Sequence, residues 1–342
     1  MMAQVPPPVA AIRVAVRRAL AGLPADSLVL VACSGGADSL ALAAATAFVA
    51  PRAGIRAGLI TIDHRLQEGS ADRAAAVTSW ARNVGLVPTL GVAVEVTRHG
   101  GPEAAARSAR YAALRAAARR HHAAAVLLGH TRDDQAETVL LALARGAGPR
   151  GLAGMPRHRD VFIRPLLDVA RADTRKACAA LGLSPWDDPH NSDPAYARSR
   201  VRQDALPALI RALGPAVVDN LARTAAQLAA DTEHLDALAG AALDAARTPN
   251  GLAVGSLTEL PDAIRTRVLH AWARELGAPG AALSHRHVVA LDALVMDWHG
   301  QGAAALPGDL RVARRGGELS CEGGHPPPDR AGKGGTAGLA HG

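Results

Sequence analysis

The chain has 342 residues, of which 49% are hydrophobic and 20% charged, so it is long enough for two domains and has the composition of a globular protein. Its net charge of +7 suggests a polyanionic partner such as a nucleic acid. Because no run of about 18 or more apolar residues lacks a charge, we expect no membrane partner. The three widely spaced cysteines argue against a disulfide framework or a zinc site and fit a cytoplasmic protein.

Residues 1–24 are predicted to form a loose tail followed by a helix. Three prolines, Pro6 to Pro8, stand where a secretion signal would have its apolar core, so we expect no signal peptide. The pattern of apolar residues predicts an amphipathic helix over residues 11–21.

Residues 25–214 alternate apolar, β-branched runs with alanine-rich stretches. The runs predict strands over residues 27–32, 55–62, 88–94 and 124–129, and the stretches predict helices over 38–50, 70–84 and 103–121. This alternation is typical of an α/β fold with a parallel sheet and helices on both faces. Ligands of such sheets bind beyond the carboxyl ends of the strands, so the turns that follow strands are where a site is expected.

The rest of this first domain is less regular. Residues 146–154 are glycine-rich and predict a mobile loop, and residues 162–167 are extended. Helices are predicted over 170–181 and 199–213. Gly214-Pro215 is a clear break, so we place the domain boundary there.

Residues 215–320 predict a small, mainly helical domain. Its helices are expected over 216–246, 261–276 and 284–298, followed by one extended element over 308–319. Residues 321–342 are rich in glycine and proline and predict a disordered tail.

The loop after the first predicted strand is the most informative segment. It reads Cys33-Ser34-Gly35-Gly36-Ala37-Asp38-Ser39 and leads directly into a helix. Glycines let backbone N–H groups approach a phosphate, and the helix dipole favours negative charge there. The loop lacks the lysine of a Walker A motif and the G-x-G of a dinucleotide site. The alternative is an ordinary turn with Asp38 in the first turn of the helix.

Two further polar segments follow strands at the same edge of the predicted sheet. Asp63-His64 comes after the second strand, and residues 129–138, which include Asp133, Asp134 and Glu137, come after the fourth. On a helix these three carboxylates share one face, where they could bind Mg²⁺ or hold an ammonium group. The alternative is that Asp133 caps the helix and Glu137 faces solvent. Because these carboxylates lie at the same edge of the predicted sheet as the glycine loop, a ligand-binding site is favoured over simple helix capping.

The pattern Ser-Gly-Gly-x-Asp-Ser resembles the pyrophosphate loop of the ATP pyrophosphatase superfamily. Within that superfamily the chain resembles the tRNA(Ile)-lysidine synthetases. The resemblance rests on motifs that occur in the family's order, namely residues 34–39, 62–64, 103–107, 110–111, 130–138, 145–148, 151–155, 164–167, 188–193, 200–202 and 206–207, and on 306–312, which resemble the end of the family's substrate domain.

The resemblance implies a ligase that works in two steps. ATP adenylates the 2-oxygen of the wobble cytidine in an isoleucine tRNA with anticodon CAU, and pyrophosphate leaves. The ε-amine of L-lysine then attacks the same carbon, and AMP leaves. ATP and Mg²⁺ are therefore the implied cofactors, tRNA(Ile) and L-lysine the implied partners, and a homodimer is possible.

The resemblance also implies roles for particular residues. Those expected to take part in catalysis are Asp38, His64, Arg107, Asp133, Asp134 and Glu137, and those expected to bind ATP are Cys33, Ser34, Gly35, Gly36, Ala37, Asp38, Ser39, Asp63, His64, Gly129 and His130. Asp38 and Asp134 are the expected metal ligands. Arg107 or Arg110 could bind phosphate, and the acidic set could hold the lysine ammonium.

The chain departs from the family in several places, namely at residues 63–67, at Thr131-Arg132 and at Ser199, where the family commonly has an asparagine. Asp63-His64-Arg65-Leu66-Gln67 stands where the family has Asp-His-Gly-Leu-Arg, so a glycine is missing and Gln67 replaces an arginine for which Arg65 could substitute.

Two other functions are kept open. One is a tRNA 2-thiolation enzyme of the same superfamily that would use Cys33 and Cys178, although a cysteine at the end of a buried strand is usually a small core residue. The other is a module that binds nucleotide or tRNA without catalysis.

Overall fold

The computed structural model describes residues 5–63, 69–94, 102–187, 193–280 and 282–322. The chain folds as two compact units, residues 1–229 and 230–342. The break predicted at Gly214-Pro215 lies between helices α9 (Leu206–Leu213) and α10 (Val217–Ala246), and α10 continues across the division between the units.

The first unit is built around a six-stranded sheet with the order β3-β2-β1-β4-β6-β5. Its strands are β1 (Leu28–Ala32), β2 (Arg56–Asp63), β3 (Thr89–Ala93), β4 (Ala123–Leu128), β5 (His158–Arg159) and β6 (Phe162–Ile163). All neighbouring pairs are parallel except β5 with β6. The predicted parallel sheet is therefore confirmed.

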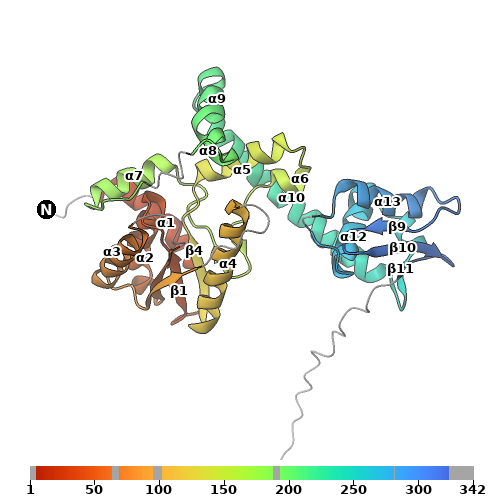
Figure 1. The fold of residues 1–342 in the computed structure, drawn as a ribbon, viewed down its shortest axis with the longest axis horizontal. Coiled ribbons are helices and arrows are strands. Elements are labelled where there is room, and N and C mark those ends of the chain that lie inside the picture. Colours follow the sequence, from red (N-terminus) through yellow and green to blue (C-terminus); the bar gives the residue numbers. More distant parts are fainter. Residues whose placement is uncertain (1–4, 64–68, 95–101, 188–192, 281, 323–342) are drawn as a thin grey trace, which may run out of the picture. The chain divides into compact units, whose positions relative to one another are not determined.

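Helices cover both faces of this sheet, as predicted. Val29 and Val31 of β1 belong to the core beneath α1 (Pro7–Leu20), α2 (Ala37–Val49) and α3 (Ser70–Asn83), whereas Leu28 and Leu30 belong to the core beneath α4 (Pro102–Arg120). Successive strand residues point to opposite faces, so one apolar run serves both cores. Figure 1 shows α1, α2 and α3 on one side of the strands and α4 on the other.

The structure corrects one local prediction in the first unit and refines two others. α1 begins at Pro7, so residues 7–10 are not tail, because proline fits the first turn of a helix, where its missing N–H is not needed. The supposed mobile loop contains the helical turn α6 (Pro149–Leu152), which packs on α5 (Arg132–Ala144). Residues 162–167 pair as a strand only over Phe162–Ile163.

The predicted helices over 170–181 and 199–213 are present with modified boundaries. The first is α7 (Arg171–Ala180). The second consists of α8 (Ala197–Arg200), the π-helical segment η3 (Val201–Ala205) and α9, which follow one another without a gap.

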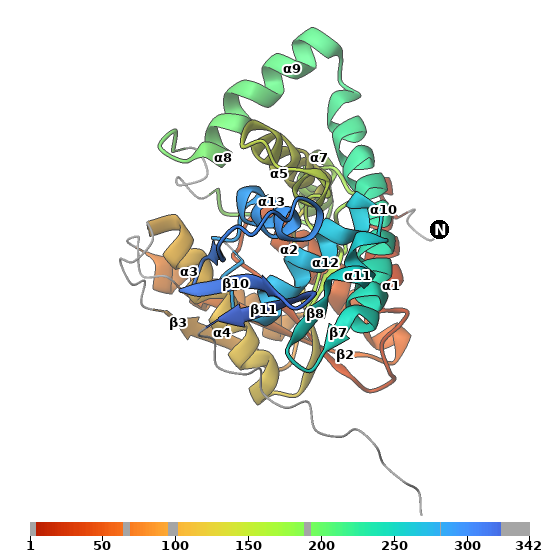
Figure 2. The same ribbon diagram turned by 90° about the vertical axis from the view of Figure 1, so that its right-hand side faces the viewer.

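The second unit has α11 (Val254–Thr258), α12 (Asp262–Glu275) and α13 (His285–Met296), as well as the end of α10. Where one extended element was predicted, five strands form an antiparallel sheet in the order β7-β8-β11-β10-β9. They are β7 (Arg247–Thr248), β8 (Gly251–Ala253), β9 (Ala304–Leu306), β10 (Leu310–Arg315) and β11 (Glu318–Glu322). Figure 2 shows β8, β10 and β11 side by side. The predicted tail over 323–342 lies outside the described residues.

Within the described residues, no single helix is long and apolar enough to cross a membrane. Helical residues 197–213 and 217–246 meet that condition only when taken together, and they are bent by 102° at the break between them.

Candidate active site

The loop between β1 and α2 is held in shape by its own hydroxyl groups. Gly35 has φ of +87°, the left-handed conformation that glycine adopts without strain. The hydroxyl of Ser39 donates to the carbonyl oxygen of Gly36 at 2.9 Å and accepts the N–H of Ser34 at 3.2 Å. The loop therefore forms a closed turn at the N-terminus of α2, with Asp38 in the first turn of that helix. Such a turn suits an anion.

The end of β4 touches this loop at Gly129. A Cβ atom at Gly129 would lie 3.1 Å from the carbonyl carbon and oxygen of Asp38 and 3.1 Å from the backbone nitrogen of Ser39. These contacts are with backbone, which cannot turn aside as a flexible side chain can. Only glycine lets β4 and the loop approach so closely.

We expect Gly129→Ala to raise the KM for ATP about tenfold, because the start of α2 must shift by a few tenths of an ångström and the loop that is expected to bind phosphate shifts with it. Steady-state kinetics with varied ATP would measure the effect. Gly22→Ala is the matched control, since its Cβ would meet nothing within 4 Å. An unchanged KM in the Gly129 variant would show that the close approach does not shape the ATP site.

Asp134 forms the N-terminal cap of α5 together with Thr131. The Asp134 carboxylate accepts the Thr131 N–H at 2.8 Å, while Thr131 is the N-cap residue. Asp133, the cap considered from the sequence, instead accepts the backbone N–H of Arg171 at 2.8 Å. Glu137 does not face solvent, because its side chain is fully buried.

Three arginines that were not among the predicted site residues surround Glu137 and Asp134. Arg171 contacts Asp134 Oδ1 at 2.7 Å through Nη2 and Glu137 Oε1 at 2.9 Å through Nη1. Arg202 contacts both oxygens of Glu137, at 2.8 and 3.1 Å, and Arg198 Nε lies 3.3 Å from Glu137 Oε2. Each oxygen of Glu137 and Asp134 is therefore already within reach of a donor from this chain.

Asp38 joins this network from the pyrophosphate-type loop. Its Oδ1 accepts the hydroxyl of Thr174, and its Oδ2 lies 3.8 Å from Nε of Arg171. Burial raises the pKa of Asp38 to about 6, although the Thr174 hydroxyl and the positive charge of Arg171 favour the ionised form. The site thus brings Asp38, Asp133, Asp134 and Glu137 together around Arg171.

The charges in this cluster do not cancel. Four carboxylates face the three guanidinium groups of Arg171, Arg198 and Arg202, so one negative charge is left when all are ionised. A cluster that holds more carboxylates than guanidinium groups attracts an added cation. The cluster can therefore accept one ammonium group at modest electrostatic cost.

Asp38 fits a Mg²⁺ ion better than Asp134 does. Among the described residues, no group of three or more acidic, histidine or cysteine side chains could hold a metal on its own. Mg²⁺ often needs only one or two carboxylates when substrate phosphates supply the other oxygens. Asp38 meets that condition because it lies at the phosphate-type loop, whereas both oxygens of Asp134 are taken by Arg171 and Thr131.

Basic residues from α4 lie near His130, which follows β4. Arg107 donates to the Tyr111 hydroxyl at 3.4 Å. Burial and the charge of Arg107 lower the pKa of Arg110. Burial and the charges of Arg164, Arg110 and Arg107 lower the pKa of His130, so its imidazole is neutral. The buried Nδ1 of His130 has no hydrogen-bond partner among the described residues.

Some predicted residues cannot be placed in the site. Asp63 ends β2, but His64 and residues 65–67, which depart from the family, lie outside the described residues, as does the motif 188–192.

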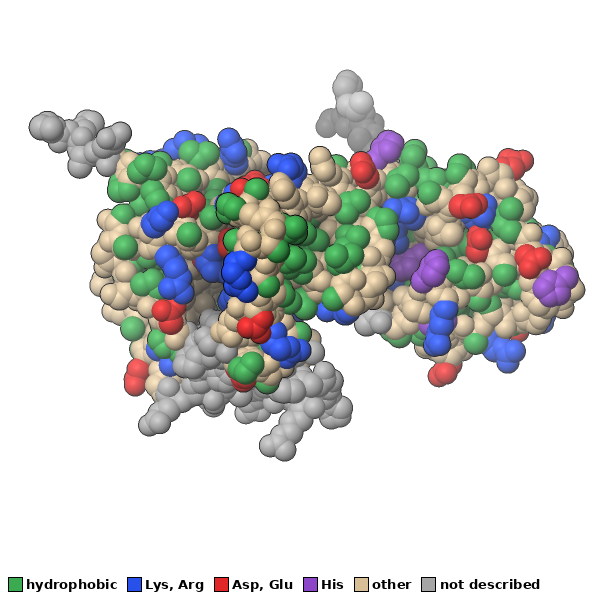
Figure 3. All heavy atoms as spheres, turned by 90° about the horizontal axis from the view of Figure 1, so that it is seen from above, with side chains coloured by type: hydrophobic (Ala, Val, Ile, Leu, Met, Phe, Trp, Pro, Cys, Tyr) green, Lys and Arg blue, Asp and Glu red, His purple; other side chains and the backbone are tan. Residues whose placement is uncertain are grey.

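Figure 3 shows lysine and arginine side chains, in blue, around a hollow in the first unit.

Cys33 and Cys178 are both buried and have raised pKa values. Burial raises the pKa of Cys33, and burial together with the charge of Asp38 raises that of Cys178 to about 11. A reactive cysteine needs a lowered pKa and access to solvent. These two thiols therefore behave as core residues rather than as carriers of sulfur.

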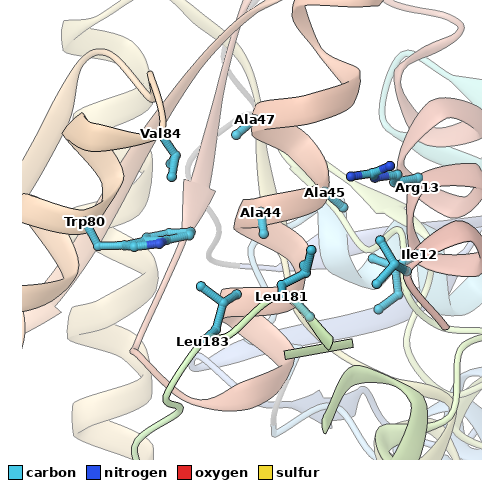
Figure 4. Close-up of a pocket in the computed structure, with 11 residues that line it drawn as sticks. Ile12, Arg13, Ala44, Ala45, Ala47, Trp80, Val84, Leu181 and Leu183 are labelled. Atoms are coloured by element: carbon cyan, nitrogen blue, oxygen red, sulfur yellow. The ribbon is translucent and has the colours of Figure 1, made fainter. Parts of the chain in front are cut away.

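Two cavities lie near the loop. One, of about 240 Å³, is lined by Ser34, Gly35, Arg73 and Trp186 among others, and the N–H of Trp186 donates to the Gly35 carbonyl at 3.0 Å. The other, of about 220 Å³, is bordered by apolar residues of α1, α2 and α3, including Ile12, Ala44 and Trp80 (Figure 4). None of the predicted site residues lines the second cavity.

Comparison with known proteins gives concordant results. Residues 12–209 match a family model described as a PP-loop domain, and residues 252–320 match one described as a TilS substrate binding domain. The chain is 68% identical to a tRNA(Ile)-lysidine synthase of Salinispora tropica over 93% of this chain and 98% of that protein. It is 58% identical to one from Thermobifida fusca, with coverage of 92% and 97%.

A solved structure with the same fold is a U34-tRNA thiolase, NcsA, from Methanococcus maripaludis. The TM-score is 0.54 at 19% identity, and the match covers 65% of this chain and 80% of that one. At this identity the likeness concerns the fold alone.

Proposed function

The chain belongs to the tRNA(Ile)-lysidine synthase family, and from this premise we propose that it joins L-lysine to the wobble cytidine of the CAU-anticodon isoleucine tRNA at the expense of ATP. The structural observation that carries the proposal is the meeting of Asp38, at a phosphate-type loop, with the acidic cluster of α5. A nucleotide and an amine could thus react at one place.

The loop is suited to the triphosphate of ATP. Backbone N–H groups at the start of α2 would bind the departing pyrophosphate, with the hydroxyl groups of Ser34 and Ser39 beside them. Mg²⁺ bound at Asp38 would offset the negative charge of the phosphates. The 2-oxygen of the cytidine attacks the α-phosphorus, and pyrophosphate leaves. The guanidinium groups of Arg107 or Arg110 would donate hydrogen bonds to a phosphate and offset its negative charge.

The acidic cluster is suited to lysine. Its one excess negative charge would attract the ε-ammonium. Asp133 offers its second oxygen, because among the described residues only Oδ2 is bound, by the Arg171 N–H. The amine must give up a proton before it attacks the adenylated carbon, and AMP then leaves. We assign His64 to nucleotide contact or proton relay on the family resemblance.

The 2-thiolation alternative lacks support from the two cysteines, which are buried with raised pKa values. A module that only binds nucleotide or tRNA would not need Asp38 linked through Arg171 to the acids of α5. Homodimer formation is proposed on the family resemblance alone, and analytical ultracentrifugation would test it.

The experiment that tests the function mixes the protein with Mg²⁺-ATP, radiolabelled L-lysine and an isoleucine tRNA transcript with anticodon CAU, and counts acid-precipitable label. We expect incorporation that requires ATP. A transcript with uridine at the wobble position is the matched control and should take up no lysine. Pyrophosphate release without lysine incorporation would keep the ATP chemistry but refute lysine as the second substrate.

A further inference from the structure

The first turn of α7 contacts all four carboxylates of the site. The Arg171 side chain binds Asp134 and Glu137 and approaches Asp38, and the Arg171 N–H binds Asp133. Three residues later in the same turn, the Thr174 hydroxyl donates to Asp38.

This turn is fixed against both partners. On the loop side, the Cys178 thiol of α7 donates to the Ala37 carbonyl at 3.4 Å, and Ala177 and Cys178 lie in the core that α2 shares. On the α5 side, the Arg132 N–H donates to the Val169 carbonyl at 3.0 Å. The N-terminus of α7 therefore cannot move independently of either group of acids.

We infer that Arg171 is a positioning residue that holds Asp38, the acid of the adenylation step, in register with Asp134 and Glu137 of the acidic cluster that would bind lysine. The inference rests on the proposed function. Without Arg171 the two groups of acids lose the guanidinium that reaches Asp38, Asp134 and Glu137 together. Lysine then approaches the adenylated carbon from the wrong direction. Water then attacks that carbon instead, AMP leaves, and the cytidine is regenerated with ATP spent.

The shape of the guanidinium explains why arginine is needed. Two nitrogens of its fork reach two different carboxylates, at 2.7 and 2.9 Å, while Nε faces a third. A lysine ammonium is a single point charge and cannot span the same three groups.

The test compares Arg171→Ala, Arg171→Lys and Arg175→Ala by the ratio of pyrophosphate released to lysine incorporated. Arg175 lies one turn further along α7 and pairs with Asp187 at the surface, so it is the matched control. We expect a ratio near one for the unmodified protein and for Arg175→Ala. In the Arg171 variants lysine incorporation should fall about a hundredfold, the usual loss when a reacting group shifts by about 1 Å, and pyrophosphate release should fall less.

The lysine variant keeps a positive charge and so tests the inference even if Arg171→Ala does not fold. Guanidinium ion added to Arg171→Ala should restore part of the coupling. A ratio that stays at one in both Arg171 variants would overturn the inference. Failure of the unmodified protein to incorporate lysine would instead refute the proposed function.

A second measurement needs neither metal nor nucleotide. If Arg171 links the two groups of acids, the shifts in Tm caused by Asp38→Asn and Glu137→Gln should not be additive in the double variant. In the Arg171→Lys background the same two shifts should become additive, because the shared partner is gone. Additive shifts in both backgrounds would contradict the link.

Discussion

Asp38→Asn is expected to lower tRNA-dependent pyrophosphate release at least about a hundredfold. A neutral amide binds Mg²⁺ much less well than a carboxylate does, so the charge of the phosphates would no longer be offset by the ion. The change is nearly isosteric, and the amide oxygen can still accept the Thr174 hydroxyl. Release of pyrophosphate at each tRNA concentration would be measured by a coupled assay. Activity within a factor of about three of the unmodified protein would remove Asp38 from the reaction.

The same substitution should stabilise the protein at pH 8 in the presence of a chelator. The pKa of Asp38 is raised from 3.8 to about 6 in the folded state, so the folded protein binds the proton more tightly than the unfolded chain does. Stability due to Asp38 therefore falls as the pH rises from about 4 to 6. Ionisation costs the folded state about 3 kcal/mol above that range, since one pKa unit is about 1.4 kcal/mol.

Chemical denaturation at two pH values would test this. We expect Asp38→Asn to gain about 2–3 kcal/mol at pH 8 and about half of that at pH 5. The control is Asp168→Asn, whose carboxylate is largely exposed and paired with Arg157 at the surface, and it should change stability by less than about 1 kcal/mol at either pH. A gain that does not depend on pH would mean that burial of the charge is not its cause.

Glu137→Gln is expected to destabilise the first unit by about 3–5 kcal/mol, which is the usual cost of removing one partner from a buried ion pair. The Glu137 side chain is fully buried, and its guanidinium partners are only 18% to 29% exposed. An amide would remove the carboxylate that contacts Arg171, Arg198 and Arg202 alike. Three carboxylates would then face three guanidinium groups, but each of these arginines would lose a close ionised partner away from water.

Urea denaturation monitored at the signal of the first unit would measure the loss, with Asp168→Asn again as the acid-to-amide control. A change below about 1 kcal/mol would show that water reaches the three arginines and screens them. A lysine incorporation assay on the folded fraction would separate this structural role from a chemical one.

The pyrophosphate-type loop and the parallel sheet could be predicted because their signals are local. A glycine turn between an apolar strand and a helix needs only neighbouring residues, and the alternation of strand and helix limits the sheet to few arrangements. The second-unit sheet escaped prediction because several of its strands have two or three residues, too few to show a period of two.

The acidic cluster shows where such reasoning stops. Asp133, Asp134 and Glu137 stand out together in the sequence, but the guanidinium groups that bind them come from residues 34 to 68 positions away. In the sequence, Arg171 and Arg198 look like ordinary exposed helix residues. Only the packing of α7 and α8 against α5 turns them inward.

The hydrogen bond from Trp186 to Gly35 also governs which way a peptide group faces. The carbonyl oxygen of Gly35 and the N–H of Gly36 belong to one trans peptide and so point in opposite directions. While the Trp186 N–H binds this oxygen, the N–H of Gly36 points away from Trp186 and the Gly35 carbonyl cannot rotate into its place. The backbone N–H of Trp186 thus opposes a flip of the peptide group between Gly35 and Gly36. The direction of that peptide dipole is therefore set before any nucleotide binds.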